Sequence, residues 1–558
     1  MFKALKELER KQYENPKVYD EHQKFLMNPN DILDAITRHF QNKFFAEEKE
    51  IITAFPGEPK PLRKPISISE VTVALKKLNN NRAAGTDNIP GELLKYGANC
   101  ISPTIAKIFN NALENHEQLD INIGLLLSLQ KPGKEKGPLK NLRPITLLNT
   151  IRKTLSTITL NRISDKVNTW LPHTQSGFRR GRSTTDIVFT HRWFMARTAR
   201  LQQEIYITGI DMSSAFDTID RSTMLNIAEE IFEQDECRMI RFLLSSTELE
   251  ISLPGATRKN SFISNIGTPQ GDSLSPVLFV IYLEHALQGI RNIDVTPLPT
   301  EICYADDVDF ISTTPRDNII EVENHLAQFD LMVNKDKTEY TTVKRSNSET
   351  EVSWRKPKKV GSLLGDHEDV ERRKQLAAAS FNKLKSLWIR RDRVKEHTRL
   401  KLYNSVVKSV LLYNCGTWGL TKQDEEKLDT FHRRQLRSLI GVSFPQRISN
   451  INLYKRCKEK PISHTIREAR WKLLGHILRM DSDAPPNKAI ACYFSDDEDF
   501  SRFRGRPRTT LPVTLLNDLK TLKDPFLNLR SEDVKHLKTV ADDRHSWQNL
   551  VRRICDTV

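Results

Sequence analysis

The sequence predicts an α/β fold of the α+β kind, in which helices flank an antiparallel sheet and the C-terminal part is helical. An apolar, β-branched segment at residues 205–210 predicts a strand that ends in Asp211. Apolar residues on both sides of the tetrapeptide Tyr-Ala-Asp-Asp at 304–307 predict a β-hairpin with two carboxylates at its tip. Residues 366–480 are mostly helical by pattern. We therefore expect carboxylates from two strand ends to converge on one sheet.

The composition indicates an intracellular globular protein. The chain has 558 residues, which is enough for roughly three or four domains, and 38% of them are apolar. Seven cysteines are spread along the chain without CxxC pairing, as in proteins with reduced thiols. No apolar run approaches the length of a membrane span, and the charged N-terminus does not resemble a signal peptide. We expect a location in the nucleus, the cytoplasm or both, without secretion or membrane insertion.

The positive charge is concentrated in one region. The formal net charge is +15, whereas residues 352–480 alone hold 30 Lys or Arg against 12 Asp or Glu, a balance of 30 − 12 = +18. Such a region most often faces a polyanion, although a solvated helical surface is the alternative. A zinc site could be formed by Cys457, His464, His476 and Cys492. Their spacings are long and irregular, so the sequence gives only weak support for this site.

The first half of the chain is expected to alternate helices with loops. Residues 1–50 read as helix and residues 55–65 as a Pro-rich linker. Helices at 68–78 and 91–96 are expected on either side of a turn-rich loop, and a strand at 125–130 precedes a basic turn. Residues 141–145 then lead into a helix that runs to residue 163. Three cations near that turn are candidates for a triphosphate, although surface charge is their commoner role: Lys131, Lys134 and Arg143.

Two Gly-containing segments could approach phosphates or a nucleotide. The segment 175–186 opens a helix and concentrates Arg179, Arg180 and Arg182 near backbone amides. The loop 267–276 contains two glycines and two prolines, which fix a surface for a flat nucleotide before a helix at 277–290. A further helix is expected at 318–333.

The carboxylates at the strand ends predict a magnesium site. Mg²⁺ takes hard oxygen ligands and shares them with substrate phosphates, so Asp211, Asp306 and Asp307 suit a site for two ions. The alternatives are ordinary ones, because Asp211 could be a helix N-cap and an Asp-Asp pair is common in turns.

The sequence resembles the reverse transcriptases of non-long-terminal-repeat (LINE-type) retrotransposons, in the neighbourhood of jockey-like elements. The resemblance covers about residues 66–365 and rests on six motifs in the family's order: NLRPITLLNTIRKTLSTITLNRI, QSGFRRGRSTTD, GIDMSSAFDTID, GTPQGDSLSP, CYADDVDF and NKDKTEY. The tail also resembles these elements, through SVLLYNCGTWGLT, RWKLLGHILRM and RGRPRTT.

The resemblance implies a right-hand polymerase with fingers, a palm that contains an antiparallel sheet, and a helical thumb. The implied division is a helical N-terminal extension with its linker at 1–65, fingers and palm at 66–365, a basic helical thumb at 366–480, and a basic linker with C-terminal helices at 481–558. The implied activity is RNA-directed DNA polymerisation, with an RNA template, a DNA primer or target, and deoxynucleoside triphosphates as partners.

The resemblance also implies roles for individual residues. Asp211, Asp306 and Asp307 are the ligands of two Mg²⁺ ions, with Mn²⁺ as a substitute, and Lys337 is the general acid for pyrophosphate. Phe216 is a steric gate against a ribose 2′-hydroxyl. The implied substrate surface consists of Lys131, Arg143, Phe216, Pro269, Gln270 and Gly271.

Arginines on the expected thumb helices and in the tail suit a nucleic-acid backbone. They are Arg390, Arg391, Arg393, Arg433, Arg434 and Arg506. For Arg506, which lies in an Arg-Gly-Arg-Pro segment, a plain basic linker is the alternative to a minor-groove contact.

Two other functions compete with RNA-directed DNA polymerisation. Residues 1–65 contain no acidic and His constellation for an endonuclease, so we expect a priming nick to come from another source, and an endonuclease supplied in trans is a candidate partner. A catalytically silent, domesticated nucleic-acid-binding protein is the alternative function, and an inert fragment is a third one.

Overall fold

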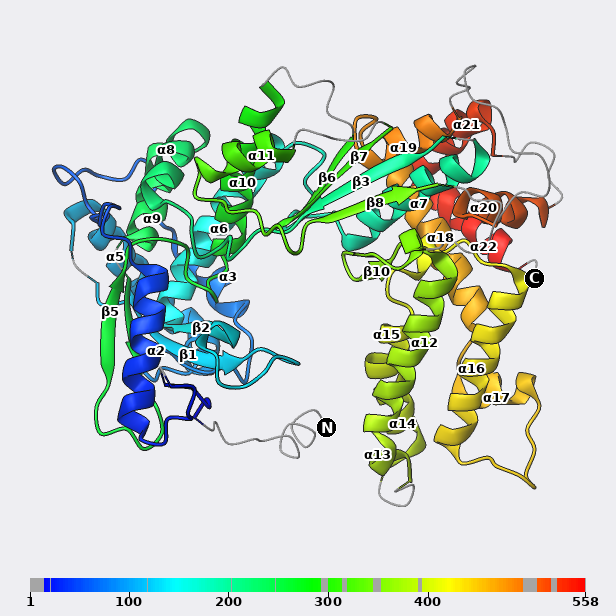
Figure 1. Cartoon of the computed structure of the whole chain (residues 1–558), viewed down its shortest axis with the longest axis horizontal. Coiled ribbons are helices and arrows are strands. Elements are labelled where there is room, and N and C mark those ends of the chain that lie inside the picture. Colours follow the sequence, from blue (N-terminus) through cyan, green and yellow to red (C-terminus); the bar gives the residue numbers. More distant parts are fainter. Residues whose placement is uncertain are drawn as a thin grey trace. The chain divides into compact units, whose positions relative to one another are not determined.

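The computed structural model separates into two compact units, each assembled from non-contiguous segments (Figure 1). Unit 1 consists of Met1–Pro172, Met212–Asp294 and Asn318–Asn334, and unit 2 consists of His173–Asp211, Val295–Asp317 and Lys335–Val558. The structure describes residues 15–20, 22–117, 119–201, 203–245, 247–292, 300–313, 319–344, 353–389, 394–494, 509–522 and 529–556. The two units interleave along the sequence, so they do not test the expected domain boundaries at 66, 366 and 481. These boundaries stay predictions.

Unit 1 contains a four-stranded sheet in the order β2-β1-β4-β5. Its strands are β1 (Ile123–Gln130), β2 (Leu142–Leu148), β4 (Thr247–Ile251) and β5 (Asn260–Ser264). Strand β1 pairs antiparallel with β2 and parallel with β4, and β4 pairs antiparallel with β5. The helix α2 (Pro29–Phe44) packs against this sheet and shares a buried core with it, which includes Phe40, Leu126 and Leu249.

Helix α2 is the only helix among the described residues of the segment 15–50, for which the sequence predicted helix throughout. It begins at Pro29, where the missing N–H costs nothing, and the Asn28 side chain caps it by accepting from the N–H of Asn30. Residues Tyr19 and Phe25 instead form an isolated antiparallel bridge. The predicted helix is therefore wrong for residues 15–28 as far as they are described.

The remaining helices of unit 1 confirm most of the predicted ones, with shifted ends. They are α3 (Ile68–Lys76), α4 (Gly91–Tyr96), α5 (Ala98–Asn115), α6 (Thr150–Trp170), α8 (Arg221–Ile231), α9 (Gln234–Leu244), α10 (Ser275–Asn292) and α11 (Ile319–Ala327). The prediction of helix up to residue 333 was wrong, because α11 ends at Ala327 and Asp330 has a left-handed backbone with a φ of 55°. The strands β2, β4 and β5 were not predicted.

Unit 2 contains the second four-stranded sheet, in the order β6-β7-β3-β8 and antiparallel throughout. Its strands are β3 (Ile205–Ile210), β6 (Thr300–Tyr304), β7 (Asp307–Ser312) and β8 (Glu339–Val343). Two residues, Ala305 and Asp306, join β6 to β7. The predicted strand at 205–210 and the predicted hairpin are therefore confirmed, and β8 is an additional strand.

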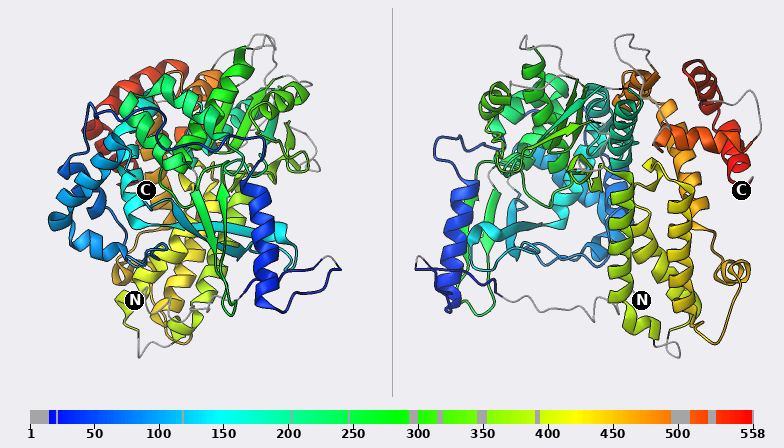
Figure 2. Two further views of the ribbon diagram at one scale, coloured as in Figure 1. Left: turned by 90° about the vertical axis from the view of Figure 1, so that its left-hand side faces the viewer. Right: turned by 45° about the vertical axis from the view of Figure 1, so that its right-hand side comes forward.

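Helices cover this sheet and form the rest of unit 2 (Figures 1 and 2). They are α7 (Thr184–Arg200), α12 (Asp366–Lys383), α13 (Lys385–Ile389), α14 (Glu396–Leu402), α15 (Ser409–Leu411), α16 (Lys422–Ile440), α17 (Asn450–Cys457), α18 (Ile462–Leu478), α19 (Pro485–Phe494), α20 (Leu511–Lys520), α21 (Ser531–Asp542) and α22 (Arg544–Asp556). None of the helices in the described ranges is long and apolar enough to cross a membrane.

One buried core joins the sheet of unit 2 to α7 and to the C-terminal helices. It includes Ile207 of β3, Ile311 of β7, Trp193 of α7, Trp471 of α18 and Trp547 of α22. Helix α19 lies along α7, where the Arg197 Nε donates to the carbonyl of Cys492 over 2.9 Å. The last helices of the chain therefore stabilise the same sheet that bears the predicted carboxylates.

Strand register places charged residues on one face of this sheet, in two successive rows. Gly209 of β3 pairs with Asp309 of β7 and with Glu339 of β8. Extending both registers by two residues along β3 places Asp211 level with Asp307 on one side and with Lys337 on the other. Because side chains alternate along a strand, both rows lie on the face that also carries Ile205 and Ile207. This face changes from an apolar core to a row in which Asp309 is buried and Glu339 is exposed, and then to exposed charge.

A lysine from outside the sheet neutralises the first of these rows. Lys359 lies in the short hairpin of β9 (Lys358–Lys359) and β10 (Ser362–Leu363), and its Nζ is 2.7 Å from Asp309 Oδ1 and 3.4 Å from Glu339 Oε2. A Cβ on Gly209 would collide with this Nζ and lie 2.8 Å from Asp309 Oδ1, so glycine leaves the space that the ammonium fills. His191 Nε2 of α7 lies 3.2 Å from the other oxygen of Asp309.

The pKa values of this row show how strongly its charges depend on each other. Although burial raises the pKa of Asp309, His191 and Lys359 together hold it below the usual range. Burial lowers the pKa of Lys359, but Asp309 and Glu339 outweigh it and raise the pKa above the usual value. Asp309 and Lys359 therefore stabilise each other's charged forms.

Replacing Lys359 is expected to destabilise unit 2. In Lys359→Met, Asp309 stays 7% exposed but loses its ammonium partner, and breaking a buried pair in this way costs about 3–5 kcal/mol. We expect the melting temperature of the full chain, measured by scanning calorimetry, to fall by several degrees. Lys358→Met, which removes the exposed neighbouring lysine, is the matched control and should leave it unchanged. Equal melting temperatures for both variants would contradict the assigned role of Lys359.

Candidate active site

Three carboxylates and one lysine gather at the end of the sheet in unit 2. Asp211 follows β3 directly, Asp306 is the second residue of the β6–β7 turn, and Asp307 begins β7. Lys337, just before β8, places its Nζ 2.8 Å from Asp211 Oδ2. The predicted catalytic residues are thus close together in one unit, although they come from three separate stretches of sequence.

The electrostatics of this cluster favour a bound cation. Burial raises the pKa of Asp306 above its ordinary value, and the carboxylate of Asp211 adds to this shift. Partial burial and the neighbouring carboxylates of Asp306, Asp309 and Asp211 raise the pKa of Asp307 to about 6. Burial is the larger cause of both shifts, and the added repulsion between the carboxylates indicates that their negative charge is incompletely compensated. Lys337 compensates only part of that charge.

The donor set fits a hard divalent ion such as Mg²⁺, because it consists of carboxylate oxygens. Asp211 is engaged with Lys337 in this structure. Within the described ranges, no three His, Cys, Asp or Glu side chains are grouped closely enough to hold a metal ion. The same finding applies to the weak zinc set around Cys457. Ion binding at the carboxylates therefore requires side-chain adjustment, for which Asp211 and Lys337 are the natural candidates.

The turn that carries Asp306 is held by a segment from elsewhere in unit 2. Ala305 adopts a left-handed backbone with a φ of 58°, which is costly for a residue with a Cβ. Its N–H donates to the Oε1 of Gln175 over 3.1 Å, and the same oxygen accepts from the N–H of Gly177 over 2.7 Å. A Cβ on Gly177 would collide with the backbone of Ala305. Gln175 and Gly177 therefore fix the position of the acidic turn.

The arginines that follow this segment differ in their surroundings. Arg180 is exposed, whereas Arg179 donates to the carbonyl of Gln175 over 3.1 Å. Arg182 contacts the sulfur of Met480 and the ring of His173, at 3.0 and 3.1 Å. Of the three arginines predicted to contact phosphates, Arg180 is the most accessible one in this structure.

Unit 1 holds all of the predicted substrate residues. Phe216 is partly exposed and stacks on Phe279 of α10, with ring centroids 4.2 Å apart. The loop of Pro269, Gln270 and Gly271 lies beside it, because the N–H of Thr268 donates to the carbonyl of Phe216 over 3.0 Å. The Gln270 amide donates to Asp217 Oδ1 over 2.8 Å, and Lys43 pairs with the other oxygen over 2.7 Å. Asp217 therefore fixes this loop to the segment that carries Phe216.

The same loop is tied to the strand that carries Arg143. The N–H of Thr146 in β2 donates to the carbonyl of Gln270 over 3.0 Å, and a Cβ on Gly271, whose φ is 120°, would lie 2.7 Å from the Thr146 carbonyl oxygen. Arg143 is exposed on β2. Lys131 is exposed at the end of β1, with its Nζ donating to the carbonyl of Lys140 over 2.8 Å. Phe216, the loop and Arg143 thus form one continuous part of unit 1.

The arginines predicted for the thumb are only partly covered by the structure. Arg433 on α16 pairs with Glu426, about two turns earlier, while Arg434 is exposed. Arg390, Arg391, Arg393 and Arg506 lie outside the described residues.

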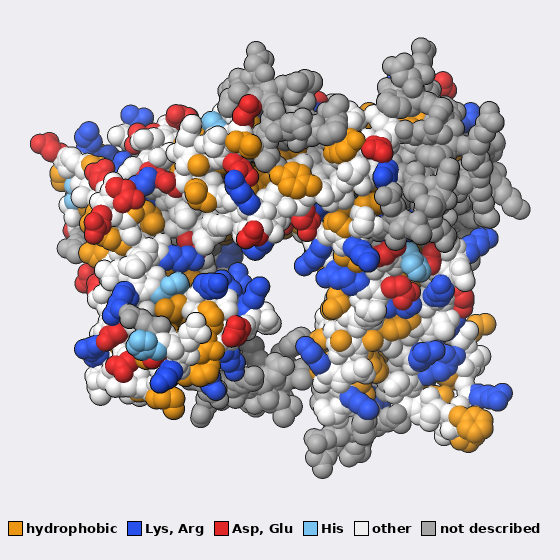
Figure 3. Space-filling model, in the orientation of Figure 1, with side chains coloured by type: hydrophobic (Ala, Val, Ile, Leu, Met, Phe, Trp, Pro, Cys, Tyr) orange, Lys and Arg blue, Asp and Glu red, His pale blue; other side chains and the backbone are white. Residues whose placement is uncertain are grey.

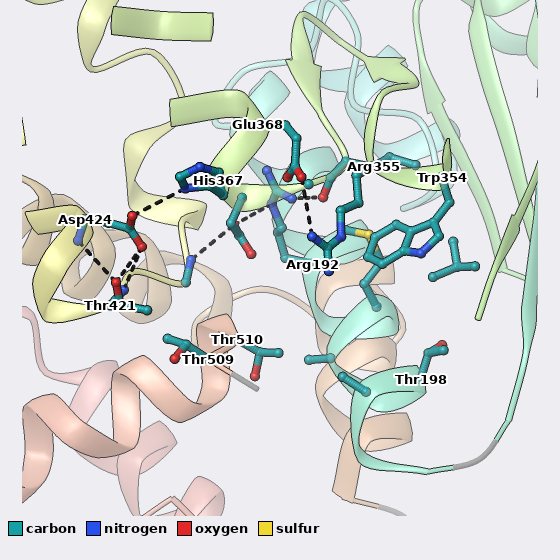
Figure 4. Close-up of a pocket in the computed structure, with 18 of the residues that line it drawn as sticks. Arg192, Thr198, Trp354, Arg355, His367, Glu368, Thr421, Asp424, Thr509 and Thr510 are labelled. Atoms are coloured by element: carbon teal, nitrogen blue, oxygen red, sulfur yellow. Dashed lines mark hydrogen bonds and ion pairs between the residues drawn. The ribbon is translucent and has the colours of Figure 1, made fainter. Parts of the chain in front are cut away.

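A separate cavity of about 260 Å³ opens in unit 2, between α7 and the first turns of α12, α16 and α20 (Figure 4). Its charged side chains pair with each other: Arg355 with Glu368 over 3.4 Å, and His367 with Asp424 over 3.4 Å. Burial raises the pKa of Asp366 to about 6, despite Arg192 Nε at 3.1 Å. Because its charges are internally matched, the cavity offers less for an ionic ligand than the carboxylate cluster does.

No sequence pattern predicted the residues that support the candidate site. Asp309 lies two positions after Asp307, and this spacing is a signal that both face the same side of a strand. Gln175 lies in an arginine-rich motif, and no local sequence pattern indicates its hydrogen bond to the turn at Ala305. Lys359 and His191 are far in sequence from Asp309, so their contacts with it follow from tertiary packing alone.

Comparison with known proteins assigns part of this chain to a family. Residues 129–369 match the family model described as reverse transcriptase (RNA-dependent DNA polymerase). The chain is 24% identical over 300 residues to the probable RNA-directed DNA polymerase from transposon BS of Drosophila melanogaster, which covers 50% of this chain and 32% of the relative. It is 22% identical over 483 residues to the RNA-directed DNA polymerase from mobile element jockey of Drosophila funebris, covering 79% and 52%.

The chain spans about a third to a half of the length of these curated relatives. Among solved structures, telomerase from Candida albicans in complex with a fragment of telomeric RNA shows 12% identity and a TM-score of 0.33, over 66% of this chain and 65% of that one. A score this low carries no argument about the fold. The family match includes Asp211, Asp306 and Asp307, and also Gln175 and Lys359 that support them. Residues 129–369 of this chain therefore belong to the reverse transcriptase family, with low-identity relatives among the polymerases of jockey and BS mobile elements.

Proposed function

We propose that this chain is an RNA-directed DNA polymerase that extends a primer 3′-hydroxyl with deoxynucleoside triphosphates, as the polymerase of a non-LTR retrotransposon. The observation that carries the proposal is the carboxylate cluster at the strand ends, which lies inside the segment that matches the family. Asp211, Asp306 and Asp307 meet there with raised pKa values for two of the three.

The carboxylates are the proposed ligands of two Mg²⁺ ions, for which Mn²⁺ is a substitute. Such ions, when bound, lower the pKa of a primer hydroxyl and neutralise the charge of the triphosphate and of the leaving pyrophosphate. Asp211 supplies oxygens from the central strand, while Asp306 and Asp307 supply them from the rigid turn that Gln175 holds. A turn held in this way keeps the backbone that carries these carboxylates in place, so that ion binding needs only side-chain adjustment.

Lys337 is the proposed proton donor to the leaving pyrophosphate. Its ammonium carries three N–H donors and lies beside Asp211, so it can hold a proton close to the point where negative charge develops. In this structure its ammonium also pairs with the carboxylate of Asp211.

Substrate recognition is assigned to the surface of unit 1. Phe216, supported by Phe279, is the proposed steric gate against the 2′-hydroxyl of a ribonucleotide. Pro269, Gln270 and Gly271 are placed next to the nascent base pair, and Arg143 with Lys131 contacts the triphosphate. An RNA template and a DNA primer or target are the proposed macromolecular partners.

The subdomain assignment belongs to the same proposal. Fingers and palm correspond to residues 66–365, the thumb to 366–480, and the N-terminal extension and the tail lie on either side. We also propose that an endonuclease acting in trans makes the priming nick. The proposed location of the protein is the nucleus or the cytoplasm.

A second candidate is a nucleic-acid-binding protein without polymerase activity. It is favoured by exposed cations in the basic region, such as Arg434, Arg447 and Lys455, none of which has an ion-pair partner in the ranges that the structure describes. Tight binding to a primer–template, with no extension by the same preparation, would support this candidate over the polymerase.

The carboxylates provide the decisive test of polymerisation. The full chain, incubated with an RNA template, a DNA primer, deoxynucleotides and Mg²⁺, is expected to extend the primer in a gel assay. Asp306→Asn with Asp307→Asn should reduce extension by at least about 10³-fold while leaving primer–template binding within a few-fold, because the acceptors of the metal are lost but the shape is kept. Asp336→Asn, beside Lys337, is the control that should retain activity. Full activity of the double variant would refute the assignment.

Phe216 provides a separate test of substrate selection. Phe216→Ala should raise incorporation of ribonucleotides relative to deoxynucleotides by about 10- to 100-fold, because it opens space where the 2′-hydroxyl would lie. Phe216→Tyr keeps the ring and should preserve the discrimination. The measurement is the ratio of kcat/KM for the two nucleotides in single-nucleotide extension. An unchanged ratio in Phe216→Ala would remove Phe216 from this role and leave the polymerase assignment intact.

A further inference from the structure

The loop between α16 and α17, residues 441–449, presents large apolar side chains to solvent. Phe444 is 85% exposed, and Ile451 in the first turn of α17 is 80% exposed. Figure 1 shows the loop extending beyond the ends of the helices that it joins. Single exposed apolar residues are ordinary, but two of this size within eight residues indicate a contact surface.

The loop is firmly anchored at its base. Gly441 ends α16 in a left-handed conformation with a φ of 84°, and the N–H groups of Gly441 and Val442 both donate to the carbonyl of Arg437, over 2.9 and 3.0 Å. The Arg437 guanidinium donates across the loop to Asn450 Oδ1 over 2.6 Å. Ser449 caps α17 by accepting from the N–H of Asn452 over 3.2 Å. These hydrogen bonds therefore hold the base of the loop, while the side chains at its tip are exposed.

Positive charge surrounds this tip. Residues 434–460 include seven Lys or Arg and a single acidic residue, Glu459, whose carboxylate is taken up by Lys408 at 2.6 Å. On α17, Ile451 and Lys455 are four residues apart, which aligns them on one side of the helix, and Lys458 follows directly after the helix. The opposite side is buried through Leu453 and Cys457.

Four cations next to the tip remain available for a ligand. Arg434, Arg447, Lys455 and Lys458 are exposed, and their side chains have no ion-pair partner in the part of the chain that the structure describes. In Figure 3, Lys and Arg side chains lie near the hydrophobic group at the lower right tip of the molecule. An exposed aromatic ring among unpaired cations matches the chemistry of a nucleic-acid strand, whose bases stack and whose phosphates are negative.

We propose that the α16–α17 loop and the exposed side of α17 form a binding surface for single-stranded nucleic acid. Phe444 stacks on an unpaired base, Ile451 extends the apolar contact, and Arg447, Lys455 and Lys458 contact the phosphates. A mainly apolar protein partner would leave these cations without counter-charge. Helix α16, with 19 residues, separates this surface by roughly 28 Å from the cavity at its first turn.

The test measures binding of the full chain to a fluorescein-labelled 20-nucleotide oligouridylate and to a blunt duplex of equal length, by fluorescence anisotropy. Phe444→Ala should weaken single-strand binding about 5- to 100-fold, and Phe444→Trp should restore it, because base stacking needs a ring. Lys455→Gln with Lys458→Gln should lower the slope of log Kd against log salt by roughly 1.4. Met27→Ala removes an apolar side chain that is 87% exposed in unit 1, and it should leave binding unchanged.

Crosslinking locates the contact directly, so other nucleic-acid sites on the chain do not obscure it. An oligouridylate that contains 4-thiouridine should crosslink to the tryptic peptide 438–447, which includes Phe444, and Phe444→Ala should abolish that crosslink. A missing crosslink together with unchanged affinity of Phe444→Ala would overturn the proposal. A Phe444 effect confined to the duplex would also overturn it, in favour of a groove contact. Loss of primer extension alone leaves both measurements unaffected, so the two proposals fail separately.

Discussion

The candidate site depends on the ammonium of Lys359, which lets a β-sheet hold closely spaced negative charge. Asp309 and Glu339 flank Gly209 in one row of the sheet, and without a cation their repulsion would act directly beneath the exposed carboxylates. The missing side chain at Gly209 provides the space for this cation. Lys359 thus compensates charge in the row of Asp309, whereas Lys337 compensates only part of the charge of Asp211, Asp306 and Asp307. An unmatched row at the surface is what a divalent cation would complete.

The acidic turn is fixed by backbone hydrogen bonds as well as by charge. Gln175 accepts from Ala305 and from Gly177 with one oxygen, so the left-handed residue before Asp306 is stabilised from a segment 130 residues away in sequence. In unit 1, Asp217 has the same kind of role, because it connects Lys43 to Gln270 and thereby fixes the loop beside Phe216. In both units, buried polar side chains position the residues proposed to react or to bind.

The C-terminal helices contribute to two different features. Trp471 and Trp547 belong to the core of the sheet that bears the candidate carboxylates, although both lie beyond the family match. The α16–α17 loop instead directs Phe444 into solvent, on a stem that Arg437 holds. The basic charge of this region is therefore divided between ion pairs that stabilise the helices, such as Lys408 with Glu459, and cations that remain accessible.

The sequence by itself determined the local features. The strand before Asp211 and the hairpin at Asp306 were predictable, because β-branched runs and tight turns have local causes, and the family followed from short motifs in order. Only the tertiary structure decided that β8 completes the sheet, that Lys337 meets Asp211, and that Lys359 and Gln175 support the carboxylates. The physical reason is that these contacts join residues 50 or more positions apart, and no local periodicity encodes such a partner.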